Sequence, residues 1–162
     1  MADQSSPAYP FGDMLALARQ SWLGAMTAGL ADLGYDGYRR ADAAATRLLL
    51  RGPVPVGRLG AALGVTRQAA RKVADSLQQR GYATTSRDHH DSRQVNVALT
   101  AAGRDYAKAV VTVIARLNRE VARRADPDSL AAADAVLRLA LFDDSARRRA
   151  DTLPRPQRPA GE

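Results

Sequence analysis

Apolar side chains recur every three or four positions along most of this chain, and that spacing is typical of amphipathic helices. The first such run begins at Phe11 and continues to Leu33, where glycines interrupt it. Shorter runs cover residues 39–51, 57–63 and 66–80. The pattern therefore predicts one long helix followed by three short ones.

A different pattern follows between Tyr82 and Leu99. Residues that favour strands occupy both ends of this stretch, and its centre, from Arg87 to Arg93, is wholly polar. This arrangement predicts an antiparallel hairpin with a polar tip. Val56 is expected to add one short strand.

The C-terminal third returns to helical spacing. Thr100 is a good N-cap for a long helix that ends near Arg124. Asp126-Pro127 marks the next boundary, because proline disfavours helix at the residue before it. A last helix then carries leucines at roughly heptad spacing and is expected to fray through its arginines at 147–149. The proline-containing polar segments expected to lack fixed structure are residues 1–10 and 151–162.

Composition and charge narrow the class of protein. The chain has 162 residues, of which 46% are hydrophobic and 25% charged, which suits one folded domain with an association element. Its formal net charge of +7 favours a polyanionic partner, although simple solubility also explains a mild basic excess. Cysteine is absent, which excludes disulfides, thiolate metal sites and thiol-based peroxide sensing. No run approaches the roughly 20 apolar residues of a membrane-spanning helix, and no signal peptide precedes the first helix. The expected location is the cytoplasm, with no membrane partner.

Basic residues gather where the pattern predicts a helix-turn-helix unit. From Arg58 to Arg93 there are seven basic residues and three acidic ones, a net charge of +4. In the second helix of the unit, the residues expected to face inward are Ala69, Val73 and Leu77. The residues left at or near the outward face of its start are Thr66, which caps the helix, and Arg67, Gln68, Arg71 and Lys72. Arginine can pair with guanine and glutamine with adenine in the major groove, while lysine and threonine suit phosphates. The alternative is an ordinary solvated helix face.

The hairpin offers a second contact with DNA. Asp91 and Arg93 lie two residues apart, so in an extended segment they point the same way and the carboxylate can brace the guanidinium. Such an arginine, with Arg87 adding charge nearby, suits the narrow and electronegative minor groove. The alternative is a surface ion pair that contributes less than about 1 kcal/mol. His89 and His90 adjoin this pair, but consecutive hairpin residues seldom converge on one metal ion, so no metal site is expected.

The ordered set of these segments resembles the MarR (multiple-antibiotic-resistance regulator) family. The segments that carry the resemblance are Leu59 to Leu63, Gly64-Val65-Thr66-Arg67-Gln68, Gly81-Tyr82, and Asp91-Ser92-Arg93 through Leu99-Thr100 to Gly103. The resemblance runs from about residue 38 to 105 and departs from the family pattern at Ala83-Thr84-Thr85, where charged or aliphatic residues are common. It implies a mainly α fold, α+β in the wing, with a winged helix-turn-helix domain at 38–100. Dimerisation helices are then expected at 11–36 and 101–150.

The resemblance also implies function. It implies a homodimeric transcription regulator, usually a repressor, that binds a pseudo-palindromic operator. By motif position, the residues from Thr66 to Lys72 named above correspond to the major-groove helix and Arg93 to the wing arginine. The family implies that a small aromatic ligand releases the DNA, and the candidate pocket residues are Trp22, Met26, Tyr35 and Tyr38. Residues of this kind at helical spacing are also ordinary core. No cofactor is expected.

Other functions remain as alternatives. The long apolar stripes of the outer helices favour a partner chain, and the alternative is that they fold back on one monomer as a bundle. A sequence-tolerant architectural or nucleoid protein would use the same basic surface, and a protein-interaction winged helix would not bind DNA at all. An enzyme is disfavoured, because the sequence has no nucleophile set and no glycine-rich phosphate loop.

Overall fold

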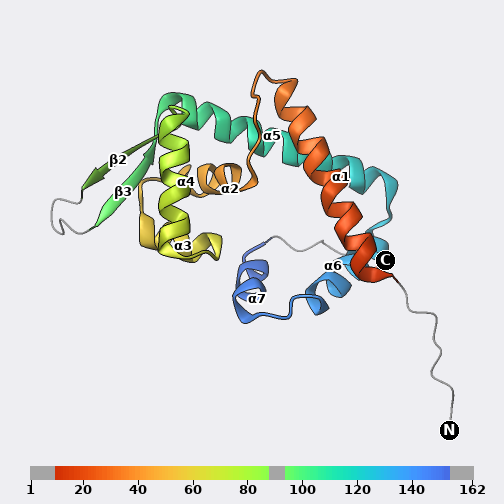
Figure 1. The fold of residues 1–162 in the computed structure, drawn as a ribbon. Coiled ribbons are helices and arrows are strands. Elements are labelled where there is room, and N and C mark those ends of the chain that lie inside the picture. Colours follow the sequence, from red (N-terminus) through yellow and green to blue (C-terminus); the bar gives the residue numbers. More distant parts are fainter. Residues whose placement is uncertain (1–9, 88–93, 154–162) are drawn as a thin grey trace, which may run out of the picture.

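One long helix joins two groups of shorter elements in the computed structural model of this chain (Figure 1). The structure describes residues 10–87 and 94–153. In chain order the elements are α1 (Phe11–Ala31), α2 (Arg40–Leu49), β1 (Val54–Pro55), α3 (Val56–Leu63), α4 (Arg67–Gln79), β2 (Ala83–Arg87), β3 (Val95–Leu99), α5 (Ala101–Arg124), α6 (Pro127–Leu139) and α7 (Asp144–Asp151). Among the described residues, no helix combines the length and the apolar character needed to span a membrane.

The elements from α2 to β3 form a winged helix-turn-helix lobe. Its antiparallel sheet has the order β1-β3-β2, and Ala83 of β2 lies opposite Leu99 of β3. The hairpin β2–β3 projects from the lobe away from α1 (Figure 1). The buried core of the lobe contains residues from α2, α3, α4, the hairpin and the start of α5, among them Leu49, Leu59, Leu77 and Val97. Sheet and helices therefore share one core, which fixes the hairpin relative to α4.

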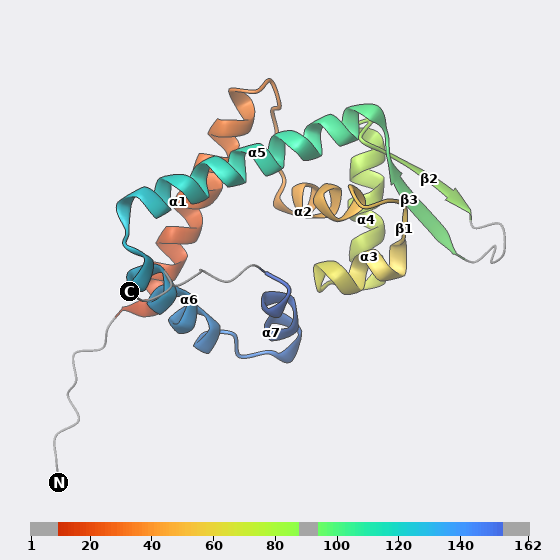
Figure 2. The ribbon, with the colours of Figure 1, turned by 180° about the vertical axis from the view of Figure 1, so that it is seen from behind.

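A second apolar cluster lies where α1 crosses α5. Met26 and Leu30 of α1 are buried there against Tyr106, Val110 and Val113 of α5. Both views show α1 lying across α5, with α6 near the start of α1 and α7 returning toward α3 (Figure 2). The long helix α5 thus belongs to both cores, because its first turns complete the lobe and its centre packs on α1.

A side chain caps the start of four helices, α4 to α7, and the sequence predicts the caps at Thr66 and Thr100. The Thr66 side chain accepts a hydrogen bond from the Ala69 amide, and the Thr100 side chain accepts one from the Gly103 amide. Asp126 caps α6, whose first residue is Pro127. These contacts satisfy amide groups that have no partner inside their own helix. The mainly α fold with a small sheet at the wing is confirmed.

The glycine at position 103 lets α5 start directly against the lobe. A Cβ built there would lie 1.8 Å from the carbonyl oxygen of Tyr82. The amide of Thr100 donates to that same carbonyl at 3.1 Å, so the two segments are held together at this point. Only glycine permits so close an approach of one backbone to another.

Three predictions of detail are wrong. Val56 is the first residue of α3, and the short strand is Val54–Pro55 just before it. The last helix is two helices, because the chain breaks after Ala140 and Asp143 caps a new one. The arginines at 147–149 therefore belong to α7 and do not fray from α6, and α7 continues into the predicted tail as far as Asp151.

The inward face of α4 also differs from the prediction. Its buried residues are Ala70, Ala74 and Leu77, whereas Ala69 and Val73 are only partly buried. The buried face is thus rotated by about one residue from the predicted one. This rotation changes which outward side chains of α4 face the hairpin.

Candidate nucleic-acid interface

The start of α4 presents a cluster of exposed polar and basic side chains. Arg67, Gln68, Arg71 and Lys72 are all exposed. Thr66 precedes them, and because its hydroxyl oxygen accepts from the Ala69 amide at 3.1 Å, its proton stays available to donate outward. The sequence predicted all of these side chains as candidate DNA contacts, and the structure brings them together on one exposed surface.

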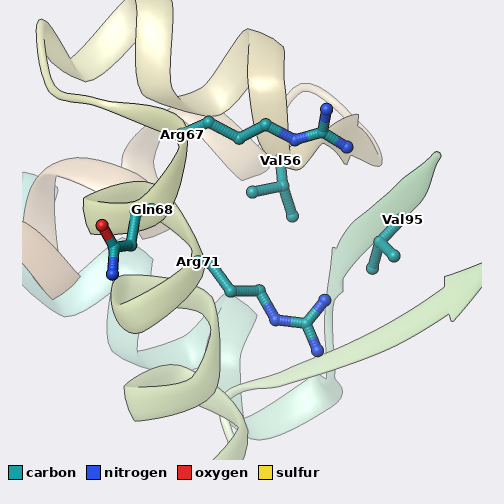
Figure 3. A pocket seen from close by; sticks show the side chains of 5 residues that line it. All are labelled: Val56, Arg67, Gln68, Arg71 and Val95. Carbon is teal, nitrogen blue, oxygen red and sulfur yellow. The ribbon is translucent and has the colours of Figure 1, made fainter. Parts of the chain in front are cut away.

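The long side chains of α4 fall into two directions. Arg67 and Arg71 are four residues apart and therefore share a face, and so do Gln68 and Lys72. Figure 3 shows the guanidinium groups of Arg67 and Arg71 extended toward β3, while the amide of Gln68 is directed away from them. Asp75 lies one turn further along the first face, and its carboxylate accepts from Arg71 Nε at 3.0 Å. This pair is about half exposed on both sides, so it contributes little to stability.

A groove separates α4 from the hairpin. Two adjoining hollows, of about 430 Å³ and 400 Å³, share Val56, Arg67 and Val95 and form one continuous concavity. We call it the α4–hairpin groove. The other residues that line it are Gln68 and Arg71 of α4, Pro55, Gly57 and Arg58 at the start of α3, and Gln94 beside β3. Sequence reasoning named neither Arg58 nor Gln94 as a site residue, although Arg58 belongs to the basic excess of this region.

The other end of α4 is anchored by a buried ion pair. Asp42 of α2 is only 2% exposed. Its Oδ2 accepts a hydrogen bond from Arg80 Nη1 at 3.1 Å and another from Ser76 Oγ at 2.9 Å. Arg39 Nη1 donates in turn to Ser76 Oγ at 2.9 Å, and Arg80 Nη2 donates to the carbonyl oxygen of Asp36 at 3.0 Å. These contacts tie the C-terminal end of α4 to α2 and to the loop before it.

Aromatic rings extend this anchor to α5. The Arg80 guanidinium lies 4.8 Å from the centre of the Tyr82 ring and 5.4 Å from that of Tyr106. The two rings are stacked, with centres 4.6 Å apart. Burial by itself lowers the pKa of Arg80, but the hydrogen bond to Asp42 and the nearby tyrosines outweigh it and raise the pKa above its ordinary value. Arg80 is therefore a fixed charge at every accessible pH.

The hairpin contributes one described basic residue. Arg87 is exposed at the end of β2, opposite Val95. The predicted brace between Asp91 and Arg93 lies outside the described residues, as do His89 and His90.

The four candidate ligand residues lie together. Met26 is buried in the second apolar cluster, and Trp22, Tyr35 and Tyr38 are partly buried and packed against it. Burial raises the pKa of Tyr38, and Arg40 opposes this effect. The centre of the cluster is Tyr106, whose ring meets that of Tyr35 edge to face at 5.4 Å. Such packing is expected if these four residues are ordinary core residues, which is the alternative to a ligand pocket.

Tyr106 has an unusual environment. It is fully buried, and its hydroxyl oxygen has no hydrogen-bond partner in the described part of the chain. Burial raises the pKa of Tyr106 to about 12. The nearby Arg80 guanidinium opposes this effect but does not outweigh it, so the buried hydroxyl keeps a desolvation cost. Sequence reasoning assigned Tyr106 to an apolar stripe and did not identify it as a polar group of this cluster.

Large apolar side chains are exposed on the helices outside the lobe. They are Met14, Leu15 and Leu17 of α1, Val121 of α5, Val136, Leu137 and Leu139 of α6, and Phe142 after it. Leu139 is 79% exposed and Phe142 is 87% exposed. These helices come from both ends of the chain and lie at one end of the molecule (Figure 1). An exposed apolar surface of this kind is typical of a protein–protein interface.

No protein-family model matches the chain, and no curated protein matches it in sequence. Solved structures do match its fold. A mutant MarR from E. coli, complexed with operator DNA, has a TM-score of 0.69 and 19% identity over 86% of this chain and 99% of that one. A probable transcriptional regulator from Pseudomonas aeruginosa has a TM-score of 0.64 and 25% identity over 80% and 95% of the two chains. BpsR from Bordetella bronchiseptica, whose DNA binding 6-hydroxynicotinic acid regulates, has a TM-score of 0.66 and 21% identity over 89% and 99%. The chain therefore has the winged-helix fold of the MarR-type regulators, as the resemblance implied.

Proposed function

We propose that this protein is a homodimeric transcription regulator, a repressor, that binds a pseudo-palindromic site on double-stranded DNA. The observation that carries the proposal is the exposed polar and basic surface at the start of α4, on a helix whose other end is anchored in the core. In a helix-turn-helix protein the start of the second helix enters the major groove. Thr66, Arg67, Gln68, Arg71 and Lys72 are the proposed contacts. Arg87, Asp91 and Arg93 are the proposed contacts from the wing.

The exposed apolar surface of α1, α5 and α6 supports the dimer. Two copies related by a two-fold axis would bury it, because the same surface on each copy then faces itself. A dimer also places two α4 helices on half-sites about one helical turn apart, which a palindromic site requires. Leu137 is 46% exposed in one chain, so Leu137→Glu should produce monomers with weaker DNA binding. Light scattering at micromolar concentration tests this, and an unmodified chain that is a folded monomer contradicts it.

We further propose that a small aromatic ligand controls DNA binding. Two observations support this proposal. The fold is shared with BpsR, a protein regulated by such a molecule. Trp22, Met26, Tyr35 and Tyr38 belong to the same apolar cluster as Tyr106, whose buried hydroxyl has no hydrogen-bond partner among the described residues. A ligand with a hydrogen-bonding group could pair with that hydroxyl and offset its desolvation cost. Titration of salicylate-like aromatics into the protein–DNA complex tests this, and release by zinc, copper or peroxide instead would contradict it.

Selection of bound fragments from random DNA tests the main proposal. A regulator enriches one palindromic sequence and prefers it over scrambled DNA of equal length. The competing function is an architectural protein, which the basic residues of α7 favour. That function predicts equal affinity for all sequences, and a protein-interaction winged helix predicts no DNA binding even at low salt, where phosphate contacts are strongest.

A further inference from the structure

We propose that the α4–hairpin groove holds one sugar-phosphate strand of the DNA, gripped by Arg58, Arg67 and Arg71. The two arginines of α4 then supply affinity that does not depend on sequence. Gln68, which also borders the groove but directs its amide away from both arginines, reads bases. This inference rests on the proposed function and divides its contacts between two roles. It reverses the sequence-based expectation that Arg67 and Arg71 pair with guanine.

The geometry of the lobe requires a strand at this place. When α4 lies in the major groove and the hairpin reaches the neighbouring minor groove, a single sugar-phosphate strand separates the two grooves. That strand has to pass between α4 and the hairpin. The α4–hairpin groove lies there, with α4 on one side, β3 on the other and the start of α3 at its end (Figure 3).

The lining of the groove matches the chemistry of that strand. Its partly exposed apolar residues, Pro55 and Val95, offer nothing to the polar edges of bases but suit the carbon atoms of deoxyribose. Its charged lining residues are Arg58, Arg67 and Arg71, and a guanidinium binds phosphate oxygens with paired N–H groups. Asp75 accepts a hydrogen bond from Arg71 Nε, so the two terminal nitrogens of Arg71 can bind a phosphate.

The directions of the side chains on α4 separate the two roles. Arg67 and Arg71 extend toward β3 and hence toward the strand, whereas the Gln68 amide is directed away from them (Figure 3). Lys72 shares the face of Gln68. The side-chain amide of Gln68 carries both a donor and an acceptor, the pair that adenine presents in the major groove.

Arg58 is the residue that makes this inference distinct from a plain recognition helix. It lies on α3, it is exposed, and it lines the groove together with Arg67. Because Arg58 borders the groove from α3, a strand that runs through the groove passes within reach of its guanidinium. Arg58 therefore tests the path of the strand, and Arg67 tests the role of α4 in it.

The experiment measures fluorescence anisotropy of two labelled duplexes, the selected operator and a scrambled sequence of equal length, over a series of KCl concentrations. Arg58→Ala and Arg67→Ala should each weaken binding to both duplexes by the same factor. Each should reduce the slope of log affinity against log salt by about 1.8, the value for one lost phosphate contact in each half-site of a dimer. Arg58→Lys keeps the charge and should keep the slope. Gln68→Ala should leave the slope unchanged and lower the operator preference at least about thirtyfold, as the loss of one base contact in each half-site predicts.

Lys108→Ala is the matched control, because it removes one charge from a side chain on α5 that is 71% exposed and does not line the groove. It should alter neither slope nor preference. If the slopes for Arg58→Ala and Arg67→Ala are unchanged while the unmodified protein still prefers its operator, the proposed path of the strand is wrong and the proposed function stands. A loss of operator preference in Arg67→Ala at constant slope shows that Arg67 reads bases and also overturns it. An unmodified protein that binds neither duplex overturns the proposed function and this inference together.

Discussion

Replacement of Asp42 by alanine probes the anchor of α4, the helix proposed to contact DNA. The Asp42 side chain is 3% exposed and that of its partner Arg80 is 18% exposed. Removal of one member of a buried ion pair leaves the other charge uncompensated, which costs about 3–5 kcal/mol. Arg80 keeps its hydrogen bond to the Asp36 carbonyl and its place over the Tyr82 ring. We therefore expect the lower end, a loss of about 3 kcal/mol in the free energy of unfolding.

Urea denaturation provides the assay, followed by the fluorescence of Trp22 and by far-UV circular dichroism. For a small domain, a loss of about 3 kcal/mol lowers the urea midpoint by about 1–3 M. All variants are compared at one protein concentration, because association would make the midpoint depend on concentration. Asp75→Ala is the matched control. It breaks the pair with Arg71, whose two side chains are 48% and 46% exposed, and should cost less than about 1 kcal/mol.

The comparison of the two variants decides the result. If Asp42→Ala lowers the midpoint no more than Asp75→Ala does, the buried pair does not stabilise the lobe and the argument for the anchor fails. Asp42→Asn separates charge from hydrogen bonding, because the amide oxygen still accepts from Ser76 or Arg80. Its urea midpoint should lie between those of the alanine variant and the unmodified protein.

Three further substitutions have definite expected outcomes. Gly103→Ala places a Cβ 1.8 Å from the Tyr82 carbonyl oxygen and should lower the melting temperature sharply, whereas Gly12→Ala, with nothing within 4 Å, should stay within about 0.5 kcal/mol. Thr66→Ala removes the cap of α4 and should cost about 1 kcal/mol, and Thr66→Ser, which keeps the hydroxyl, should cost little; an equal loss in both would place the effect outside the cap. Tyr106→Phe removes the unpartnered hydroxyl and should raise the free energy of unfolding by about 1 kcal/mol. Burial raises the pKa of Tyr106 from 10.0 to about 12, so the folded state favours the neutral hydroxyl over the ionised one. The stability that depends on this preference is complete below pH 10 and is lost as the pH rises toward 12. Thermal melts from pH 7 to 12 should therefore show a smaller alkaline loss for Tyr106→Phe, and an identical loss refutes the assignment.

Features that depend on neighbouring residues could be predicted from the sequence. The caps at Thr66, Thr100 and Asp126 are local hydrogen bonds, each to an amide three residues further along the chain. The bounds of α5 follow from such a cap at its start, and the bounds of the hairpin follow from a change of period. The break between α6 and α7 was missed, although Asp143 caps α7 by the same local bond to the Ala146 amide. The apolar period continued across the break and concealed it.

Features that depend on packing could not be predicted. On α4, alanines occupy positions 69, 70 and 74, so two rotations of the helix bury similar residues. Contacts with α2, α3 and the hairpin select the one that buries Ala70 and Ala74. The ion pair between Asp42 and Arg80 joins residues 38 positions apart, and no local pattern indicates it. Arg58 carried a visible charge, but only the position of the groove identifies it as a candidate contact.

The two ends of α4 thus depend on different parts of the molecule. Its first turn is held by its own cap at Thr66, so the side chains proposed to contact DNA are positioned locally. Its last turn is held through Arg80, which contacts both Asp42 of α2 and the ring of Tyr106 on α5. Tyr106 in turn meets Tyr35 in the aromatic cluster proposed to bind a ligand. A ligand that binds there can act on α4 only if it binds more tightly when Tyr106 and Arg80 have shifted, because equal affinity for both arrangements moves no equilibrium. Under this mechanism Tyr106→Phe retains operator binding but loses its response to the ligand, whereas a Tyr106→Phe complex that the ligand still dissociates would place the coupling elsewhere.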